Sequence, residues 1–356
     1  MEIIFLINNI QLGGGGERVC INLANAFSTK GYNIRIISIS GEKSNNILFN
    51  LDTKVNVEYF NINSKKNKLL SKLKAIYLLN KKLKRSEKSL ILGIGTYPSI
   101  LIGLIINKGQ IKTVGCMHGS YSALSLFWRT LTKMIFPKLN VIVSLTLHDE
   151  KILKSINKNV RVIHNSTQYL RGEKALLINK NILALGRLSD EKDFFTMIDI
   201  FGKFNEEEQD WTLTIRGAGP LEEKLISYLN KKELSEKIFL LPPTQHVEKE
   251  FLNSSMLLLT SKNEGFPMAI VEAQTFGVPV ISYDCLTGPS EIIKDSLNGF
   301  LVKPGDKSTF IDKMKLLSRN IQLRKEIGNA AYEHSILFQE SEVLNKWFKL
   351  LIEINN

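Results

Sequence analysis

The sequence predicts an α/β protein of two domains, each built around a parallel sheet. Its 356 residues exceed one ordinary hydrophobic core and suit two domains of roughly 150 to 180 residues. Short apolar runs with strand character alternate with helical stretches along the chain. Several of these strands end in glycine-containing turns, which is typical of the carboxyl edge of an open parallel sheet.

The N-terminal half opens with a buried strand at residues 1–7, a loop that ends in Gly13 to Gly16, and a helix. These are also the ingredients of a dinucleotide-binding motif. The third glycine of that motif would fall on Arg18, and the strand at 34–39 ends in serines where a ribose-binding acid is expected. The sequence therefore disfavours that interpretation. Further strands are expected at 89–94, 112–117, 141–145 and 160–163.

The α/β pattern pauses over residues 166–177, which we interpret as the linker between domains. We expect an N-terminal domain over 1–168, a C-terminal domain over 169–339, and a helix over 340–356. Strands of the second domain are expected at 183–185, 211–215, 256–260 and 280–283.

Two glutamates, Glu264 and Glu272, bracket a predicted helix start in the second domain. Pro267 suits the first turn of that helix because it has no amide hydrogen to donate, and Gly277 is the expected end. The pair therefore follows the strand at 256–260, where open α/β sheets bind ligands. Carboxylates can accept from the neighbouring hydroxyls of a sugar, while free helix amides attract phosphate, so the element suits a sugar nucleotide.

Two cations follow another strand of this domain. Arg187 comes directly after Gly186 at the end of the strand, and Lys192 lies five residues further on. Arginine can bind phosphate oxygens in a bidentate fork, and lysine adds a point charge. The pattern therefore favours a phosphate site beside the two glutamates.

At these positions the chain resembles the retaining glycosyltransferases of family four. The likeness is carried by Gly186-Arg187 with Lys192, by the element from Glu264 to Glu272, by residues 277–281 and by residues 298–302. The resemblance implies the GT-B fold, in which two Rossmann-like domains face each other across a cleft and the C-terminal helix crosses back to the N-terminal domain. It implies that the first domain, 1–168, binds the acceptor and the second, 169–339, the nucleotide sugar. It also implies that Glu264 contacts the donor sugar, Glu272 the ribose, and the two cations the diphosphate.

The same resemblance extends the site into the first domain. His118 follows the strand at 112–117 and matches a histidine that lies near the donor sugar in this family. The glycine loop approaches the donor phosphates or the acceptor there. The residues expected to act in catalysis are His118, Arg187, Lys192 and Glu264. Those expected to bind the donor are Gly14, Gly15, Gly186, Arg187, Lys192, Glu264, Gly265, Phe266, Pro267, Met268 and Glu272.

The chain departs from the family pattern at the end of the first domain. The family shows a proline where His164 stands and a glycine where Ser166 stands, which leaves the geometry of this turn open.

No metal or other cofactor is expected. Cys20, Cys116 and Cys285 lack paired spacing, which indicates small core residues, and no Asp-x-Asp motif stands at a strand end. No apolar stretch reaches the length of a membrane span, and the start lacks the basic lead of a signal peptide. We therefore expect a cytoplasmic protein that is peripheral at the inner face of the cell membrane.

Charge is divided unevenly along the chain. Residues 1–170 carry 24 Lys and Arg against 8 Asp and Glu, whereas residues 171–356 carry 23 against 27. Ten of the cations lie in Lys65–Lys88, interleaved with apolar residues at helical spacing, and Leu124–Leu139 is a second basic, apolar segment. Both suit an anionic membrane surface, with a merely solvated basic helix as the alternative. Nucleic acid is disfavoured because Tyr77 is the one aromatic residue in Lys65–Lys88.

The sequence thus leads us to expect a retaining glycosyltransferase of bacterial cell-surface polysaccharide synthesis, such as that of capsule or lipopolysaccharide. It would move a hexose or N-acetylhexosamine from a nucleotide sugar, a UDP-sugar above all, to a glycan or lipid-linked saccharide acceptor. Two alternatives remain open. One is a nucleotide-sugar hydrolase or epimerase, which would turn over donor without an acceptor. The other is a non-catalytic membrane- or glycan-binding module.

Overall fold

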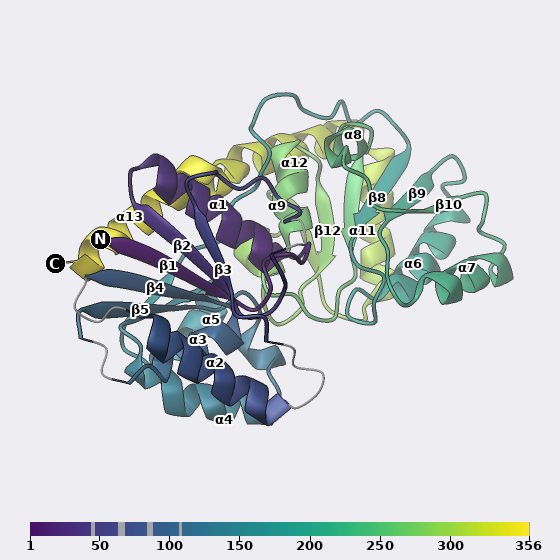
Figure 1. The fold of residues 1–356 in the computed structure, drawn as a ribbon. Helices are drawn as coiled ribbons and strands as arrows, with labels where there is room; N and C mark the ends of the chain where they lie inside the picture. Colours follow the sequence, from purple (N-terminus) through teal and green to yellow (C-terminus); the bar gives the residue numbers. More distant parts are fainter. Residues whose placement is uncertain (44–46, 63–67, 84–87, 107–108, 356) are drawn as a thin grey trace. The chain divides into compact units, whose positions relative to one another are not determined.

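A computed structural model describes residues 1–43, 47–62, 68–83, 88–106 and 109–355. The chain divides into two compact units, one formed by Met1–Asn165 with Leu344–Asn356 and the other by Ser166–Val343 (Figure 1). A parallel sheet forms the centre of each unit, so the predicted α/β class with two Rossmann-like sheets is confirmed.

The N-terminal sheet has the strand order β3-β2-β1-β4-β5-β6-β7, and all its pairings are parallel. Its strands are β1 (Glu2–Ile7), β2 (Asn33–Ser38), β3 (Asn56–Tyr59), β4 (Ser89–Ile94), β5 (Ile111–Cys116), β6 (Val141–Ser144) and β7 (Val160–Val162). Six of them lie where the sequence predicts a strand, because their apolar runs are buried in the sheet. The short edge strand β3 was not predicted, since its Asn-Val-Glu-Tyr sequence contains a single aliphatic residue.

Helices cover both faces of this sheet. They are α1 (Gly15–Thr29), α2 (Lys68–Lys82), α3 (Thr96–Gly103), α4 (Leu126–Ile135) and α5 (Leu147–Lys154), with short 3-10 turns at Tyr121–Ala123 and Phe136–Lys138. On one face, Phe5 of β1 contacts Phe27 of α1, with ring centroids 6.0 Å apart. On the other, Ile4 and Leu6 share a hydrophobic core with side chains of α2 and α3.

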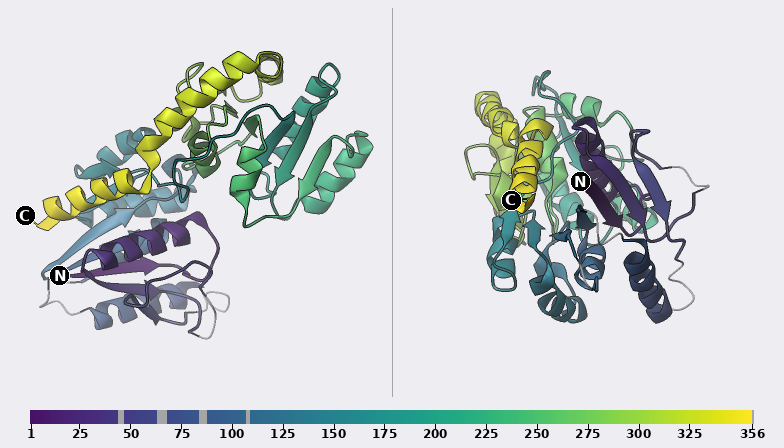
Figure 2. Two further views of the ribbon diagram at one scale, coloured as in Figure 1. Left: turned by 90° about the horizontal axis from the view of Figure 1, so that it is seen from above. Right: turned by 60° about the vertical axis from the view of Figure 1, so that its left-hand side comes forward.

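The end of the last helix, α13 (Glu340–Asn355), belongs to the N-terminal unit. The ring of Phe348 lies 5.5 Å from that of Phe27, and Arg161 forms an ion pair with Glu353 at 3.1 Å. Both views of Figure 2 show the C-terminus beside the N-terminal sheet. The predicted return of the C-terminal helix to the first domain is therefore confirmed.

The predicted basic segment Lys65–Lys88 forms α2, while its residues 65–67 and 84–87 lie outside the described part of the chain. Apolar residues of this segment divide between two environments. Ala75, Leu79 and Leu83 are buried, whereas Leu70, Leu73 and Tyr77 are exposed. The helix therefore packs one apolar face on the core and also carries exposed apolar side chains on its outer face.

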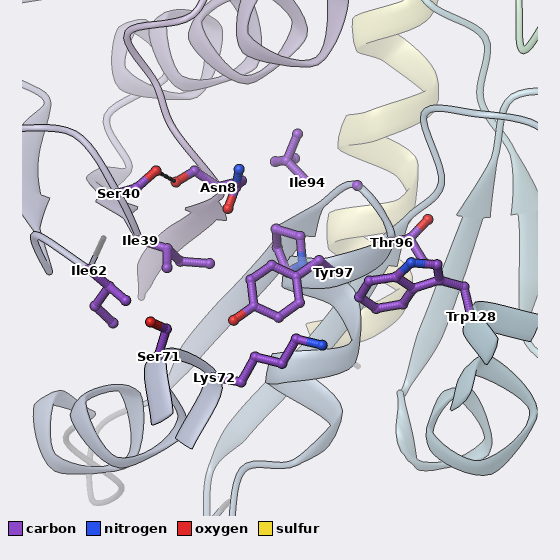
Figure 3. A pocket seen from close by; sticks show the side chains of 12 residues that line it. Asn8, Ile39, Ser40, Ile62, Ser71, Lys72, Ile94, Thr96, Tyr97 and Trp128 are labelled. Atoms are coloured by element: carbon purple, nitrogen blue, oxygen red, sulfur yellow. Dashed lines mark hydrogen bonds between the residues drawn. The ribbon is translucent and has the colours of Figure 1, made fainter. Parts of the chain in front are cut away.

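A cavity of about 500 Å³ opens at the carboxyl ends of β1, β2 and β4 (Figure 3). Asn8 follows β1, Ser40 follows β2, and Tyr97 lies at the start of α3 after β4. Lys72 of α2 and Trp128 of α4 complete the wall opposite these strands. Because the sheet grows in opposite directions from β1 and β4, the cavity lies at the switch point of this unit.

The C-terminal sheet has the strand order β10-β9-β8-β11-β12-β13 and is also parallel throughout. Its strands are β8 (Asn181–Leu185), β9 (Thr212–Arg216), β10 (Ile238–Leu241), β11 (Met256–Leu259), β12 (Val280–Tyr283) and β13 (Phe300–Val302). Its helices are α6 (Phe194–Asn205), α7 (Glu222–Lys231), α8 (Val247–Leu252), α9 (Met268–Thr275), α10 (Pro289–Ile292), α11 (Lys307–Arg319) and α12 (Ile321–His334), followed by a 3-10 turn at Ser335–Phe338.

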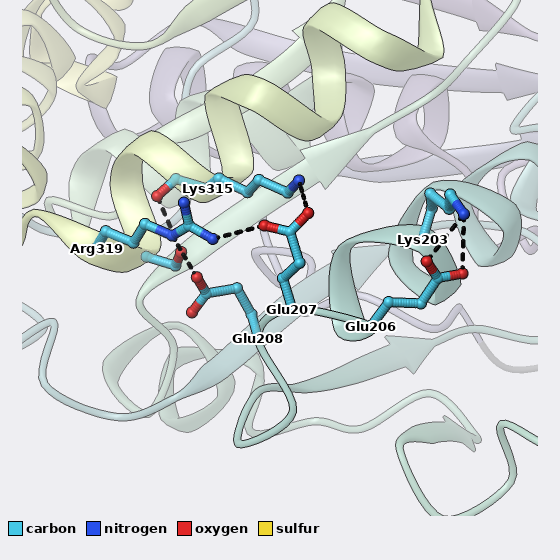
Figure 4. Close-up of polar contacts among 7 residues, drawn as sticks. Lys203, Glu206, Glu207, Glu208, Lys315 and Arg319 are labelled. Carbon is cyan, nitrogen blue, oxygen red and sulfur yellow. Dashed lines mark hydrogen bonds and ion pairs between the residues drawn. The ribbon is translucent and has the colours of Figure 1, made fainter.

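An ion-pair network joins the loop after α6 to α11 on the surface of this unit (Figure 4). Glu207 accepts from Lys315 at 2.7 Å and from Arg319 at 2.8 Å, and Glu208 accepts from Arg319 at 2.6 Å. The paired cations lower the pKa of Glu207. Isolated surface pairs contribute little to stability, but here Arg319 is shared between two glutamates, so the ion pairs form a network.

Gly93 of β4 gives a direct test of how closely α3 packs on the N-terminal sheet. A Cβ there would lie 2.6 Å from the amide nitrogen of Ser99 and 2.8 Å from the carbonyl carbon of Pro98. Both atoms are backbone, so Gly93→Ala should lower the free energy of unfolding of this unit by about 1–3 kcal/mol. Urea denaturation would measure the change. Gly16→Ala is the matched control, because a Cβ there meets no atom within 4 Å, and an equal midpoint for both variants would contradict the packing.

Candidate functional site

The predicted cations and glutamates of the C-terminal unit follow two neighbouring strands. β8 lies between β9 and β11, so the sheet grows in opposite directions from β8 and β11. Arg187 and Lys192 come after β8, and Glu264 comes after β11. Since ligands of open α/β sheets bind at such a switch point, the fold brings both predicted groups to the expected place.

The backbone of the loop that carries the cations is held by hydrogen bonds on both sides. Leu188 N donates to the carbonyl of Ala218 at 3.0 Å. On the other side, Thr260 Oγ1 donates to the carbonyl of Lys192 at 3.2 Å, and Lys262 N donates to the carbonyl of Glu191 at 2.8 Å. The loop is therefore fixed between the ends of β9 and β11.

Two glycines after β9 allow this close approach. A Cβ on Gly217 would collide with the carbonyl oxygen of Gly186, and a Cβ on Gly219 would collide with that of Leu188. Neither carbonyl can move without breaking the loop geometry. The predicted glycine turn after this strand thus has a structural reason, which is to leave room for the backbone that precedes Lys192.

Lys192 and Glu264 form an ion pair that the sequence did not predict. Lys192 Nζ lies 2.5 Å from Glu264 Oε1, and Ser261 Oγ donates to the same oxygen at 2.7 Å. The Glu264 side chain is 9% exposed and that of Lys192 is 25% exposed. The carboxylate is therefore oriented through Oε1, whereas Oε2 has no hydrogen bond within the described residues and is left for another donor such as a hydroxyl.

Arg187 stands apart from this pair. Its side chain is exposed, and the hydrogen bonds and ion pairs recorded among the described residues do not include its guanidinium. It lies one residue after Gly186 on the same held loop. The site thus offers one cation that is already paired and a second that can turn to an anion.

The helix after Glu264 begins one residue later than predicted. Pro267 occupies the position before α9, with φ −74° and ψ 94°, and Met268 is the first helical residue. The extended ψ of Pro267 turns the chain into the helix. The predicted end is confirmed, since α9 finishes at Thr275 and Gly277 has a left-handed φ of 69°.

Glu272 lies on α9 and is 8% exposed. It is a buried carboxylate one turn inside the helix, whereas Glu264 lies in the loop before it. Phe266 of the same element is 7% exposed, and its ring lies 5.7 Å from that of Phe338, so this ring is used in packing. Gly265 and Met268 are partly exposed on either side of it.

A third strand end packs against this element. Thr287 Oγ1, after β12, donates a hydrogen bond to the carbonyl of Glu264. Gly288 has a φ of 101°, and a Cβ there would lie 2.6 Å from Pro267 Cδ. The Thr-Gly-Pro segment after β12 therefore fixes the backbone of Glu264 and Pro267, a role that its turn residues alone did not reveal.

In the N-terminal unit, Gly14 and Gly15 are exposed at the start of α1. A Cβ on Gly15 would meet no atom within 4 Å. The base of this loop is fixed instead, because Gln11 Nε2 donates to the carbonyl of Glu42 at 2.5 Å and Gln11 Oε1 accepts from its amide at 3.1 Å. Gly15 thus lies open on a tethered loop, whereas the carbonyl of Gly14 accepts from the amide of Arg18 at 3.2 Å.

His118 lies two residues after β5 in the same unit. Both of its ring nitrogens are buried without a hydrogen-bond partner among the described residues, although the residue as a whole is partly exposed. Burial lowers the pKa of His118 to about 4, because desolvation disfavours the charged ring. The imidazole is therefore neutral near pH 7.

Asp149 supports the segment after His118 and was missed by the sequence analysis. It is 3% exposed, and its Oδ2 accepts a hydrogen bond from the amide of Tyr121 at 3.0 Å. Asp149 lies in the first turn of α5, three residues after Thr146, whose side chain caps the helix. The sequence could therefore indicate an acid at the start of a helix, but not its contact with Tyr121.

Three further features of the described residues bear on the sequence analysis. The three cysteines are buried and not disulfide-bonded. No group of three His, Cys, Asp or Glu side chains in the described ranges could hold a metal ion. In the same ranges, every helix is too short or too polar to cross a membrane.

Comparison with known proteins identifies both halves of the chain. Residues 13–167 match the family model described as Glycosyltransferase Family 4, and residues 173–334 match that of Glycosyl transferases group 1. The chain is 28% identical to Amylovoran biosynthesis glycosyltransferase AmsD of Erwinia amylovora, covering 98% of this chain and 99% of that protein.

A second relative and a solved structure agree. The chain is 26% identical to the GalNAc-alpha-(1->4)-GalNAc-alpha-(1->3)-diNAcBac-PP-undecaprenol alpha-1,4-N-acetyl-D-galactosaminyltransferase of Campylobacter jejuni, covering 100% of this chain and 99% of that enzyme. A mutant of S. aureus TarM in complex with Fondaparinux, alpha-GlcNAc-glycerol and UDP matches at TM-score 0.84 and 17% identity over 100% of both chains, which shows the fold. With a family match for each half and this fold for the whole, the chain belongs to the family-four glycosyltransferases of the GT-B fold.

Proposed function

We propose that this glycosyltransferase moves a hexose or N-acetylhexosamine from a UDP-sugar to a glycan or lipid-linked saccharide, with retention at the anomeric carbon. The observation that carries the proposal is the meeting of Lys192 and Glu264 at the switch point, where the exposed Arg187 lies on the same loop as Lys192. Cations for a diphosphate and carboxylates for hydroxyls are the two groups that a nucleotide sugar requires. The relatives named for N-acetylgalactosamine transfer and amylovoran synthesis favour the same substrate class.

In this proposal the cations act on the leaving group. When the bond from the anomeric carbon to the diphosphate breaks, negative charge develops on the phosphate oxygens. Arg187 and Lys192 would stabilise the transition state, in which that charge develops, more strongly than the ground state. This difference lowers the barrier. Lys192 would exchange Glu264 for phosphate, and this exchange would release Glu264 Oε1 to accept from a sugar hydroxyl.

The remaining predicted residues take positioning roles. Glu272, buried on α9, would hold the ribose hydroxyls, and the first amides of α9 would face the phosphates. His118 is neutral, so it would contact the donor sugar as a hydrogen-bonding group and not as a cation. Gly14 and Gly15 would contribute backbone amides. We propose that the transfer needs no metal and therefore persists in the presence of a chelator.

We further propose that the N-terminal unit docks on the anionic inner face of the cell membrane. Lys72 Nζ lies 5.3 Å from the ring centroid of Phe127, so α2 and α4 adjoin. Their outer sides combine exposed apolar residues with exposed cations. This α2–α4 surface consists of Leu70, Leu73, Lys74, Tyr77, Lys81, Leu126, Phe127, Lys133, Met134 and Lys138. Apolar side chains flanked by lysines are what an anionic lipid surface binds.

Nucleotide binding tests the proposed function directly. At 100 times the dissociation constant a ligand adds about 2.7 kcal/mol, which raises the melting temperature by several degrees. We expect UDP and one UDP-sugar to produce this shift, and Lys192→Met to reduce it. Lys224→Met, an exposed cation of the same unit, is the control and should retain it. No shift with any UDP or GDP compound would overturn the donor assignment.

Turnover tests the role of Arg187. Arg187→Ala should lower kcat by roughly 10²- to 10³-fold, by analogy with the loss of one preorganised stabilising donor. The unliganded melting temperature should not change, because the side chain is exposed. Sugar transfer and donor hydrolysis without acceptor would be measured together, and Arg187→Lys should fall between wild type and alanine. A loss below tenfold would remove Arg187 from the proposed mechanism, and donor turnover that needs no acceptor would favour a hydrolase.

Vesicle sedimentation tests the α2–α4 surface. Each lysine near an anionic membrane contributes about 1 kcal/mol, so Lys74→Gln with Lys81→Gln should weaken binding to phosphatidylglycerol vesicles about 30-fold. Neutral phosphatidylcholine vesicles should bind weakly in every case. The matched control is Lys151→Gln with Lys158→Gln, which removes two exposed cations elsewhere on this unit. Equal binding by the two double variants would show that the surface does not dock.

A further inference from the structure

The cavity of the N-terminal unit is a second site that the predicted donor residues do not explain. It lies at the switch point between β1 and β4 and has a volume of about 500 Å³. Ligand pockets for small molecules span roughly 300 to 1,000 Å³. His118, Gly14 and Gly15 are not among its lining residues. Position and size both fit a substrate pocket that is separate from those residues.

Two aromatic rings line the cavity. Tyr97 and Trp128 meet edge to face, with ring centroids 6.2 Å apart and planes at 68° (Figure 3). Ile39, Ile62 and Ile94 supply aliphatic lining. The C–H faces of a pyranose ring are apolar, whereas its hydroxyls point outwards. Rigid aromatic side chains therefore provide a surface on which a sugar ring can lie, because they offer large apolar area at low cost in conformational entropy.

Polar groups are placed around this apolar floor. Ser40 Oγ donates to the carbonyl of Asn8 at 2.9 Å, so its lone pairs remain available to accept. The recorded hydrogen bonds of the described residues do not use the carboxamide of Asn8, which is exposed at the carboxyl end of β1. A carboxamide, which both donates and accepts hydrogen bonds, can recognise sugar hydroxyls together with a neighbouring serine hydroxyl.

One cation completes the pocket. Lys72 Nζ lies 5.2 Å from the ring centroid of Trp128 and 5.3 Å from that of Phe127. Among the described residues no carboxylate lies within ion-pair distance of Lys72. Lys82, at the C-terminal end of the same helix, differs in this respect, because it pairs with Glu58 at 3.2 Å. Lys72 thus has aromatic contacts but no anion, and it points into an apolar pocket where an anion would be bound strongly.

We propose that this pocket binds a phosphorylated saccharide, with the sugar ring against Tyr97 and Trp128 and the phosphate at Lys72. As an extension of the proposed transferase function, the ligand would be the acceptor, and its phosphate would belong either to a lipid-linked saccharide or to a soluble sugar phosphate. Because Lys72 also touches Phe127 of the α2–α4 surface, a lipid attached to that phosphate would leave the pocket towards this surface.

Tryptophan fluorescence tests the pocket without any transfer reaction. The chain has three tryptophans, and Trp211 and Trp347 are 3% exposed, so a ligand in the pocket reports through the partly exposed Trp128. The probes are N-acetylglucosamine 1-phosphate, N-acetylglucosamine, inorganic phosphate, and phosphatidylcholine vesicles with or without polyprenyl-diphosphate N-acetylglucosamine. We expect the phosphorylated sugar, free or in vesicles, to change the fluorescence, and Trp128→Phe to abolish the signal.

Affinity in charge variants decides the role of Lys72. Lys72→Met should weaken binding of the phosphorylated sugar at least tenfold, and Lys72→Arg should recover part of the loss. Lys151→Met, an exposed cation on α5, should bind as wild type does. A response to the vesicle-bound probe alone would assign the lipid-linked source, and a response to the free sugar phosphate would assign the soluble one.

Several results would overturn the proposal. They are equal binding of the sugar with and without phosphate, binding of inorganic phosphate alone with equal affinity, an effect of Lys72→Met below twofold, or no response to any probe. Each can occur while UDP still raises the melting temperature, so failure of this pocket is distinguishable from failure of the donor assignment.

Discussion

The parallel pairing of β8 with β11 is the constraint on which the candidate donor site depends. It places two loops from distant parts of the chain at one sheet edge, where Lys192 of the first meets Glu264 of the second. Because Gly217 and Gly219 have no side chain, the first loop can pack directly against their backbone. Thr287, which follows the next strand, holds the second loop by a hydrogen bond to the carbonyl of Glu264. Three strand ends thus fix one ion pair, which is how a site gains precision from rigid elements.

Much of this arrangement could be predicted because short stretches of sequence determine it. Buried runs such as residues 89–94 and 256–260 indicate strands, and Pro267 with Gly277 brackets a helix. The contact between Lys192 and Glu264 could not be predicted from either loop, since the two residues are 72 positions apart and their meeting depends on strand order. The same applies to Asp149 and Tyr121, where a buried acid acts on a backbone amide of another loop.

The cavity of the N-terminal unit shows the same limit more clearly. Its wall combines Asn8, Ser40, Lys72, Tyr97 and Trp128, which belong to five separate segments and form no motif. The sequence indicated that residues 65–88 and 124–139 are basic and apolar, but not that Lys72 of the first contacts Trp128 of the second. Composition predicted the chemistry of the surface, whereas only the fold determined which side chains share a pocket.

The return of α13 to the first unit has a consequence for the connectivity of the chain. Phe348 covers Phe27, so the first unit takes its last helical segment from the far end of the sequence. A fragment that stopped at residue 165 would leave this aromatic contact open to water and invite aggregation. A circular permutation that placed residues 344–356 ahead of Met1 would instead make the unit continuous, and is the rational way to study its folding alone.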